Sequence, residues 1–371
     1  MKNNNFQKNK IGNFYKNKKI LITGHTGFKG SWLSLWLHMY GAKILGISNS
    51  IPTKPSHYKL IQLKNLIKEK KLDIRDYKKL NKEIKNFEPD IIFHLAAQAI
   101  VSKSFNNPIE TWSTNLNGTL NILESLRFFK KKCTVIFITS DKCYENREIN
   151  IGYKETDRLG GSDIYSASKA SVEIAINSYF QSFIKDNKKI LIGIGRAGNV
   201  IGGGDWAENR LIPDCVRSTS LLKKLNIRNP NSTRPWQHVL EPLSGYINLG
   251  YALSKNLKLN NEAFNFGPPS KNNFSVINVI KEMKKTWEKI NFKVLNKNFI
   301  KESSLLSLNC TKAVKKLKWT PTLTFAETIK ETVIWYKKFY NNDYNNLLDL
   351  SKKQIVDYVN LAKKRNKDWS K

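Results

Sequence analysis

Short apolar runs alternate with amphipathic stretches through the first half of the chain. Six runs are candidate strands, namely KILIT (19–23), KILGIS (43–48), KLDIRD (71–76), DIIFHLAA (90–97), TVIFITS (134–140) and KILIGIG (189–195). Runs rich in Ile, Leu, Val and Phe are typical of strands buried in a parallel sheet. The stretches between them, such as SWLSLWLHMYG (31–41), have helical periodicity. This alternation predicts an α/β fold, a doubly wound parallel sheet of the Rossmann type with helices on both faces.

The alternation stops at about Asn199. Glycines at 202–204 and prolines at 213, 230, 235, 242, 268 and 269 leave room for short elements only. We therefore expect a smaller, mostly C-terminal α/β lobe that binds the substrate. The expected division is a flexible polar arm (1–17), a dinucleotide-binding domain (18–198, with about 236–266), a substrate lobe (199–235 and 267–345) and a polar basic tail (346–371).

Lysine dominates the charge of the chain. The 63 Lys and Arg residues exceed the 30 Asp and Glu residues, which gives a formal net charge of +33. A charge of this size would suit a nucleic-acid partner. The excess is spread along the whole length, however, which favours a general bias in residue usage. A basic surface would still attract small anionic substrates.

The cysteines and the hydrophobic runs indicate the compartment. Four cysteines form no CxxC pair and have no histidine cluster near them, which argues against a metal site and suits a reducing compartment. The opening segment has no apolar core of a signal peptide, and no window is long enough for a membrane span. We expect a soluble cytoplasmic protein with no membrane partner.

Three glycines, Gly24, Gly27 and Gly30, lie between the first predicted strand and the following helix. Glycine is required where the chain turns tightly, where its backbone approaches a pyrophosphate, and where helix and strand pack closely. The amino end of the helix also offers free N–H groups to phosphate. The segment predicts a dinucleotide site, in which Lys29 either pairs with a phosphate or is solvated.

Candidate acid–base residues follow the later strands. Tyr165 and Lys169 are four residues apart in YSASK, so they share one face of a helix, and a nearby ammonium favours the phenolate that can act as a base. Asp141 and Lys142 come directly after TVIFITS, at the sheet edge where such folds bind ligands. On that stretch alone, a solvated turn is the simpler interpretation.

Together, GxxGxxG (24–30), HLAAQ (94–98) and YSASK (165–169) resemble the extended short-chain dehydrogenase/reductase family. The resemblance implies that Thr139 is the catalytic hydroxyl that works with Tyr165 and Lys169. Asp73 would bind adenine, although alone it could be a cap or turn residue. The implied NAD-binding residues are Gly24, Gly27, Phe28, Lys29, Gly30, Asp73, Ile74, Leu95, Ala96, Ala97, Asn115, Tyr165 and Lys169.

The second predicted strand departs from the family pattern. It ends at Ser48 and Asn49 without the acid that usually holds the adenosine ribose of NAD. NAD is still favoured, because no Arg follows that strand to bind a 2′-phosphate, although Lys54 could do so. We expect weak retention of NAD.

Within this family, an acid–base pair directly after the catalytic hydroxyl is typical of sugar-nucleotide 4,6-dehydratases, whereas 4-epimerases lack it. Lys142 stands in place of the usual Glu, and with GGGDWAENRLIPD and RPWQHVLEPL this variant resembles the dehydratases of CDP-glucose, from about Lys18 to beyond Tyr336. Asp141 suits the acid for the C6 hydroxyl if burial keeps it protonated, and Lys142 suits the base at C5 if burial and Lys169 lower the pKa of its ammonium, with Glu155 as a reserve. Such a reaction leads toward deoxysugars of a bacterial surface glycan.

The resemblance also places the nucleotide sugar against the second half of the chain. The implied substrate residues are Asn199, Arg210, Arg228, Arg234 and His238. A guanidinium can hold phosphate with two hydrogen bonds, although each Arg could instead form a surface salt bridge, and His238 is better explained as structural than as catalytic.

Helices around Asn115 and Tyr165 carry apolar outer faces, which in this family form a dimer; a tetramer is the alternative. The competing functions are another sugar-nucleotide 4,6-dehydratase, a 4-epimerase and a Rossmann-fold protein that binds RNA. The last is disfavoured because the base-stacking motifs of RNA modules are missing.

Overall fold

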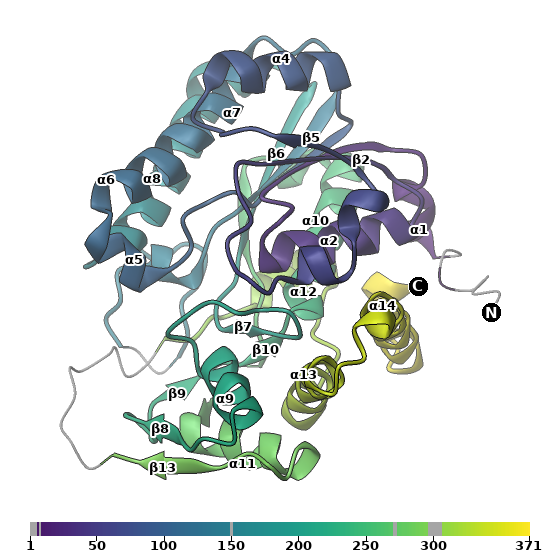
Figure 1. Ribbon diagram of the computed structural model, residues 1–371. Coiled ribbons are helices and arrows are strands. Elements are labelled where there is room, and N and C mark those ends of the chain that lie inside the picture. Colours follow the sequence, from purple (N-terminus) through teal and green to yellow (C-terminus); the bar gives the residue numbers. More distant parts are fainter. Residues whose placement is uncertain (1–5, 7–8, 149–150, 270–272, 296–305) are drawn as a thin grey trace.

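A seven-stranded parallel sheet forms the centre of the computed structural model (Figure 1). The structure describes residue 6 and residues 9–148, 151–269, 273–295 and 306–371. In spatial order the strands are β11 (Glu262–Asn265), β6 (Ile190–Arg196), β5 (Cys133–Ile138), β4 (Ile91–His94), β1 (Lys19–Thr23), β2 (Lys43–Ser48) and β3 (Lys68–Lys71). The strand order reverses between β1 and β4, as in doubly wound folds, so the predicted fold class is confirmed. β3 lies just before the predicted run at 71–76.

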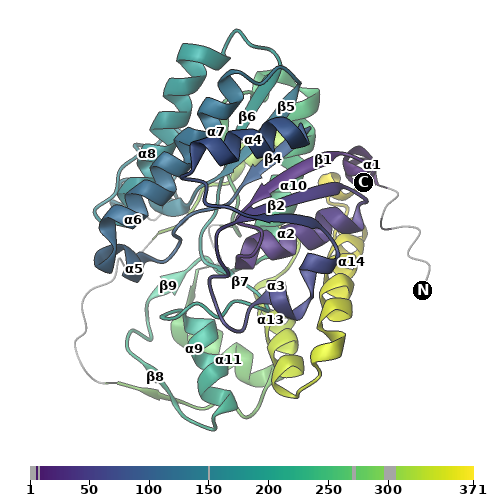
Figure 2. The same cartoon turned by 45° about the horizontal axis from the view of Figure 1, so that its top comes forward.

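Helices cover both faces of the sheet (Figure 2). α2 (Phe28–Met39) and α10 (Leu240–Lys255) pack on one face, and α4 (Tyr77–Phe87), α7 (Gly118–Arg127) and α8 (Ile164–Tyr179) pack on the other. Alternate residues of β5 show this division. Ile136 and Ile138 join the core under α2 and α10, whereas Val135 and Phe137 join the core under α7 and α8.

A smaller lobe is built largely from the second half of the chain (Figure 1). It contains α9 (Leu211–Ser220) and α11 (Val276–Thr286), with α13 (Phe325–Tyr340) packed against α11. Short strands pair as β8 (Leu225–Ile227) with β13 (Phe292–Val294), β9 (Thr233–Arg234) with β12 (Phe274–Ser275), and β7 (Val200–Ile201) with β10 (Gln237–His238). Since α10 and β11 return to the sheet, most of 236–266 lies with the first domain. The remaining short α-helices are α3 (His57–Leu60), α5 (Val101–Asn106), α6 (Pro108–Trp112) and α12 (Thr311–Leu317).

Both ends of the chain differ from the sequence expectation. Part of the expected arm forms α1 (Lys10–Tyr15), and the buried Tyr15 hydroxyl donates to Ile247 O at 2.7 Å. Most of the expected tail forms α14 (Leu347–Lys364), which packs on α2 and α13 through buried side chains that include Ile355 and Val359. Exposed lysines, among them Lys10, Lys353 and Lys364, interrupt the apolar positions of both segments in the sequence.

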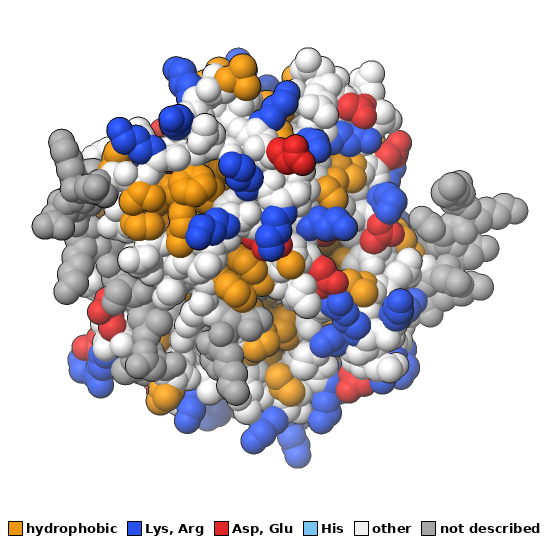
Figure 3. Space-filling view, turned by 90° about the horizontal axis from the view of Figure 1, so that it is seen from below, with side chains coloured by type: hydrophobic (Ala, Val, Ile, Leu, Met, Phe, Trp, Pro, Cys, Tyr) orange, Lys and Arg blue, Asp and Glu red, His pale blue; other side chains and the backbone are white. Residues whose placement is uncertain are grey.

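The basic side chains do not form one continuous stripe on the face shown in Figure 3. Lys and Arg are dispersed there among neutral, apolar and acidic groups. This face therefore offers no continuous basic track for a nucleic-acid backbone.

Candidate active site

The glycine turn closes tightly between β1 and α2. Gly24 has φ +76°, and a Cβ there would lie 2.8 Å from Ala96 N, so the turn lies directly against the 95–97 loop. A Cβ at Gly30 would collide with Gly24 O. Gly27 caps α2 with no side-chain hydrogen bond, which leaves the amino end of that helix open to an anion. The geometry fits the pyrophosphate of a dinucleotide such as NAD.

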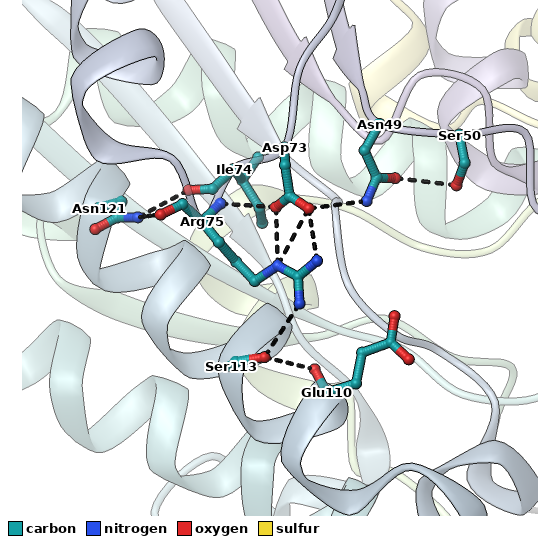
Figure 4. A network of polar contacts seen from close by, with 8 residues as sticks. All are labelled: Asn49, Ser50, Asp73, Ile74, Arg75, Glu110, Ser113 and Asn121. Atoms are coloured by element: carbon teal, nitrogen blue, oxygen red, sulfur yellow. Dashed lines mark hydrogen bonds and ion pairs between the residues drawn. The ribbon is translucent and has the colours of Figure 1, made fainter.

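Asp73 lies beside the end of β2, in the network of Figure 4. Its carboxylate accepts hydrogen bonds from Arg75 Nη2 at 2.7 Å and from Asn49 Nδ2 at 3.2 Å. The hydrogen bonds with Arg75 lower the pKa of Asp73 to about 2. Asn121 Nδ2 donates to Ile74 O at 2.9 Å and so fixes the backbone next to Asp73. Arg75, which the sequence analysis passed over, thus places a guanidinium close to the expected adenosine position.

Asn115 connects the 94–98 loop to the helix that carries Tyr165. Its Oδ1 accepts from Gln98 N at 2.8 Å, and its Nδ2 donates to Ser168 Oγ at 2.8 Å. The residue is buried in a short π-helical turn, Ser113–Asn117, a feature often found at functional sites. The cofactor loop and α8 are therefore held in register.

Tyr165 and Lys169 lie on one buried face of α8, which Asp163 caps. Burial raises the pKa of Tyr165 to about 12, while a hydrogen bond with Ser140 acts in the opposite direction. Burial lowers the pKa of Lys169 to about 8, although Glu173 works against this fall. Their shared buried face is compatible with general acid–base chemistry.

Thr139, the hydroxyl suggested by the family resemblance, contacts α8 at Glu173. Its Oγ1 donates to Glu173 Oε1 at 2.6 Å, and both side chains are 3% exposed. By strand alternation, Thr139 continues the face of β5 that carries Val135 and Phe137 and packs under α8. The next residue, Ser140, is the hydroxyl that lowers the pKa of Tyr165, which makes Ser140 the better candidate for the catalytic hydroxyl.

Asp141 and Lys142 follow Ser140 in a short 3₁₀ helix, Asp141–Cys143. Asp141 is buried, and its Oδ1 accepts from Ser140 Oγ at 2.9 Å. A Cβ at Gly198 would collide with the Asp141 carboxylate, so glycine is needed there for close approach. Lys142 is partly buried. The hydroxyl, the acid and the phenol thus form one connected group.

Lys29 and Arg210 bring two further cations near this group. Burial lowers the pKa of Lys29 to about 8, Lys169 and Arg210 lower it further, and Asp141 opposes the shift. Arg210 Nη1 pairs with Asp205 Oδ2 at 2.8 Å. Such a concentration of positive charge suits an anionic ligand such as a diphosphate.

Tyr246 on α10 also escaped the sequence analysis. It is fully buried, and within the described residues its hydroxyl has no hydrogen-bond partner. Asp141 and Tyr165 are close enough to add to the rise that burial causes in its pKa. Its aromatic ring also lies 5.9 Å from Lys29 Nζ.

The remaining expected substrate residues lie at different places. Asn199 follows β6 with φ +50°, and its carbonyl accepts from Gln237 N at 3.3 Å. Arg228 and Arg234 lie in the smaller lobe, at β8 and β9. His238 is fully buried, which lowers its pKa to about 3, and it packs edge-on against Trp32, in agreement with a structural role. Arg210 shares the electrostatic surroundings of Lys29 and Tyr165.

Glu155, the reserve base, lines a different cavity of about 1160 Å³ beside β6 and β11. Its Oε1 accepts from Asn265 N at 2.8 Å, and burial raises its pKa. Among the described contacts, none joins it to Ser140, Asp141 or Tyr165, so its geometry does not favour a role at C5.

Within the same described residues, no cluster of three or more His, Cys, Asp or Glu is arranged to hold a metal ion, and no helix is long and apolar enough to cross a membrane.

Comparison with known proteins extends over nearly the whole chain. Residues 21–332 match the model of the family described as GDP-mannose 4,6 dehydratase. The chain is 42% identical to CDP-glucose 4,6-dehydratase of Salmonella typhimurium over 352 residues, which cover 94% of this chain and 98% of that protein. It is 30% identical to dTDP-D-glucose 4,6-dehydratase of Dictyostelium discoideum, over 62% of this chain and 54% of that protein.

Solved structures agree on the fold. UDP-glucuronic acid 4-epimerase from Bacillus cereus, in complex with UDP-glucuronic acid and NAD, superimposes with a TM-score of 0.74 at 23% identity and covers 87% of this chain and 100% of its own. At that identity the likeness shows the fold alone. The family match includes the glycine turn and the Tyr165–Lys169 pair, and it covers most of the chain. The chain therefore belongs to the GDP-mannose 4,6 dehydratase family.

Proposed function

We propose that this protein is an NAD-dependent dehydratase that converts CDP-glucose to CDP-4-dehydro-6-deoxyglucose and water. The observation that carries the proposal is the Ser140–Asp141–Lys142 segment held against Tyr165, since the acid and base follow the catalytic hydroxyl directly. The 42% identity to a CDP-glucose 4,6-dehydratase over almost the full length supports the choice of CDP-glucose among sugar nucleotides.

The cofactor site uses the turn and loops already described. Gly24, Gly27 and Gly30 admit the pyrophosphate, Lys29 adds positive charge, and Asp73 with Ile74 receives the adenine side. When bound, NAD supplies a hydride acceptor for C4 and a hydride donor for C6 of the sugar. Asn49 in place of an acid at the end of β2 favours weak retention of the cofactor.

Tyr165 takes the proton from the sugar O4, and Lys169 favours its phenolate and orients the cofactor ribose. Ser140, hydrogen-bonded with Tyr165, positions O4 beside the phenol. Oxidation at C4 makes the neighbouring C5 hydrogen acidic. Lys142 removes that proton, and Asp141 protonates the departing C6 hydroxyl, so that one water leaves and a C5–C6 double bond remains. Lys142 then returns a proton to C5 as the hydride taken from C4 is delivered to C6.

The proposed substrate contacts place the diphosphate near Asn199 and Arg210, with Arg228 and Arg234 contributing from the smaller lobe.

The proposed assembly is a homodimer, with a tetramer as the alternative. Exposed apolar side chains on α5, α6 and α8, namely Phe105, Ile109 and Ile174, support an interface there. We place the reaction in the cytoplasm, in deoxysugar synthesis for a surface glycan.

Mass spectrometry of the products tests the proposal. The purified protein is incubated with CDP-, dTDP-, GDP- and UDP-glucose, with and without added NAD. We expect loss of one water from CDP-glucose, with a dependence on added NAD. Unchanged masses for all four would contradict it; a change of sugar configuration at unchanged mass would indicate an epimerase, and salt-sensitive RNA binding without turnover would indicate an RNA-binding protein.

A further inference from the structure

A buried hydrogen bond links the end of β5, which precedes Ser140, Asp141 and Lys142, to α8, which carries Tyr165 and Lys169. Thr139 Oγ1 donates to Glu173 Oε1 at 2.6 Å. Glu173 lies four residues after Lys169 and eight after Tyr165, so all three share one face of α8. Thr139 directly precedes Ser140 and Asp141. This contact therefore ties the end of β5 to the catalytic face of α8.

Arg196, the last residue of β6, holds the other side of the Glu173 carboxylate. Its Nε lies 2.9 Å from Oε1 and 3.0 Å from Oε2, and Nη2 also donates to Oε2. Both side chains are nearly inaccessible to water. The guanidinium thus fixes the carboxylate in the orientation that accepts the Thr139 hydroxyl.

Arg196 also reaches the far end of the 140–144 segment. Its Nη1 donates to Tyr144 Oη at 2.6 Å, and its guanidinium lies 4.7 Å from the centre of the Tyr144 ring. The segment that carries Ser140, Asp141 and Lys142 is therefore anchored on both sides, through Thr139 before it and Tyr144 after it. The two anchors meet at one buried ion pair.

We propose that Thr139, Glu173 and Arg196 form a positioning latch that fixes the Ser140–Lys142 segment relative to Tyr165 and Lys169. None of the three contacts the reacting atoms in this account; they act through the residues they hold. A displacement of about 1 Å between reacting groups can cost about 100-fold in rate, so such a latch would be visible in kcat.

Glu173 also affects the pKa of Lys169. Lys169 is surrounded by Glu173 on its own helix, Cys143 on the 3₁₀ helix, Lys29 on α2 and His94 on β4. Burial keeps Cys143 neutral by raising the pKa of its thiol, and it keeps His94 neutral by lowering the pKa of its ring. Glu173 is therefore the carboxylate beside Lys169 that opposes the effect of burial on the pKa of Lys169.

Thr139→Val tests the latch with the least disturbance, because it removes the hydroxyl, keeps the shape and leaves the Glu173–Arg196 pair intact. This kinetic test rests on the proposed function. We expect kcat to fall about 10-fold with KM for CDP-glucose nearly unchanged, and Thr139→Ser to restore most of it. Thr134→Val, a buried threonine at the start of the same strand, is the matched control and should retain the wild-type kcat.

Hydrogen–deuterium exchange gives a second readout that needs no turnover. Peptides spanning 139–144 and 165–173 should exchange faster in Thr139→Val and not in Thr134→Val. Wild-type kcat and exchange in Thr139→Val, or a Thr139→Ser variant as impaired as Thr139→Val, would overturn the latch. If the wild type turns over no sugar nucleotide, the proposed function fails, and the exchange result alone decides the latch.

Glu173→Gln tests the charge. Removing the anion should move the alkaline limb of the kcat/KM profile to lower pH, because Lys169 then loses its proton more easily. A limb at the wild-type pH would contradict this part of the latch. If Glu173→Gln does not fold because it leaves Arg196 unpaired, the Thr139 variants still decide.

Discussion

The Ser140 hydroxyl lies close enough to Tyr165 to lower the pKa of its phenol, whereas the hydroxyl of the residue before it, Thr139, donates to Glu173 Oε1 at 2.6 Å. Ser140→Ala should therefore reduce kcat far more than Thr139→Val. We expect a loss of about 100- to 10,000-fold, the range for positioned proton-transfer groups, against about 10-fold for Thr139→Val. Steady-state kinetics with CDP-glucose measures both, and the reverse order would restore Thr139 as the catalytic hydroxyl.

Substitutions of Asp141 and of Lys142 should affect two different steps of the reaction. In Asp141→Asn the base remains, so the C5 hydrogen should still exchange with solvent deuterium while release of water falls by about 100-fold or more. In Lys142→Ala both exchange and water release should fall together. Proton NMR in deuterium oxide reports the exchange, and product mass reports the water. Normal C5 exchange in Lys142→Ala would remove Lys142 from its proposed role.

The activity should decline as the pH rises through about 8. Lys169 must be charged to favour the Tyr165 phenolate, and its pKa falls to about 8 because it is buried. Lys169→Arg, whose guanidinium keeps its proton, should move the alkaline limb of the kcat/KM profile to higher pH. The pKa of Lys29 is also about 8, so Lys29→Met is the matched comparison. A limb that moves only in Lys29→Met would assign the titration to Lys29.

Glu241 should make the stability of the fold depend on pH. It is buried on α10, where Tyr358 Oη donates to its Oε2 at 2.7 Å, and burial raises its pKa from 4.5 to about 7. As the pH rises from 4.5 to 7, the unfolded chain releases this proton before the folded one. The free energy of unfolding therefore decreases by up to about 3 kcal/mol between pH 4.5 and 7. In thermal unfolding, the Tm of Glu241→Gln relative to the wild type should increase between pH 4.5 and 7; a constant difference would contradict the assignment.

The features that the sequence predicted are those encoded within one segment. The apolar runs gave the sheet, and the spacing of Gly24, Gly27 and Gly30 gave the cofactor turn, because each depends on local backbone demands. Tyr165 and Lys169 were found because four residues on a helix place both side chains on one face.

The features that the sequence did not predict depend on contacts between distant segments. Which of Thr139 and Ser140 lies near Tyr165 depends on how the chain after β5 turns toward α8, and a run that is apolar on both faces does not reveal this. Arg75 and Tyr246 come from segments without a motif, and only the fold brings them to the site. Ile11 and Tyr15, four residues apart, did carry a helical signal within the expected arm, but the surrounding lysines outweighed it.

The central claim is an internal oxidation and reduction of one sugar with loss of water. CDP-glucose that carries deuterium at C4 tests it most directly, with the product examined by mass spectrometry and by NMR at C6. The account predicts a product lighter by one water that retains the deuterium in its C6 methyl group. A product of unchanged mass with deuterium still on C4, or a dehydrated product whose deuterium has passed to solvent, would contradict it.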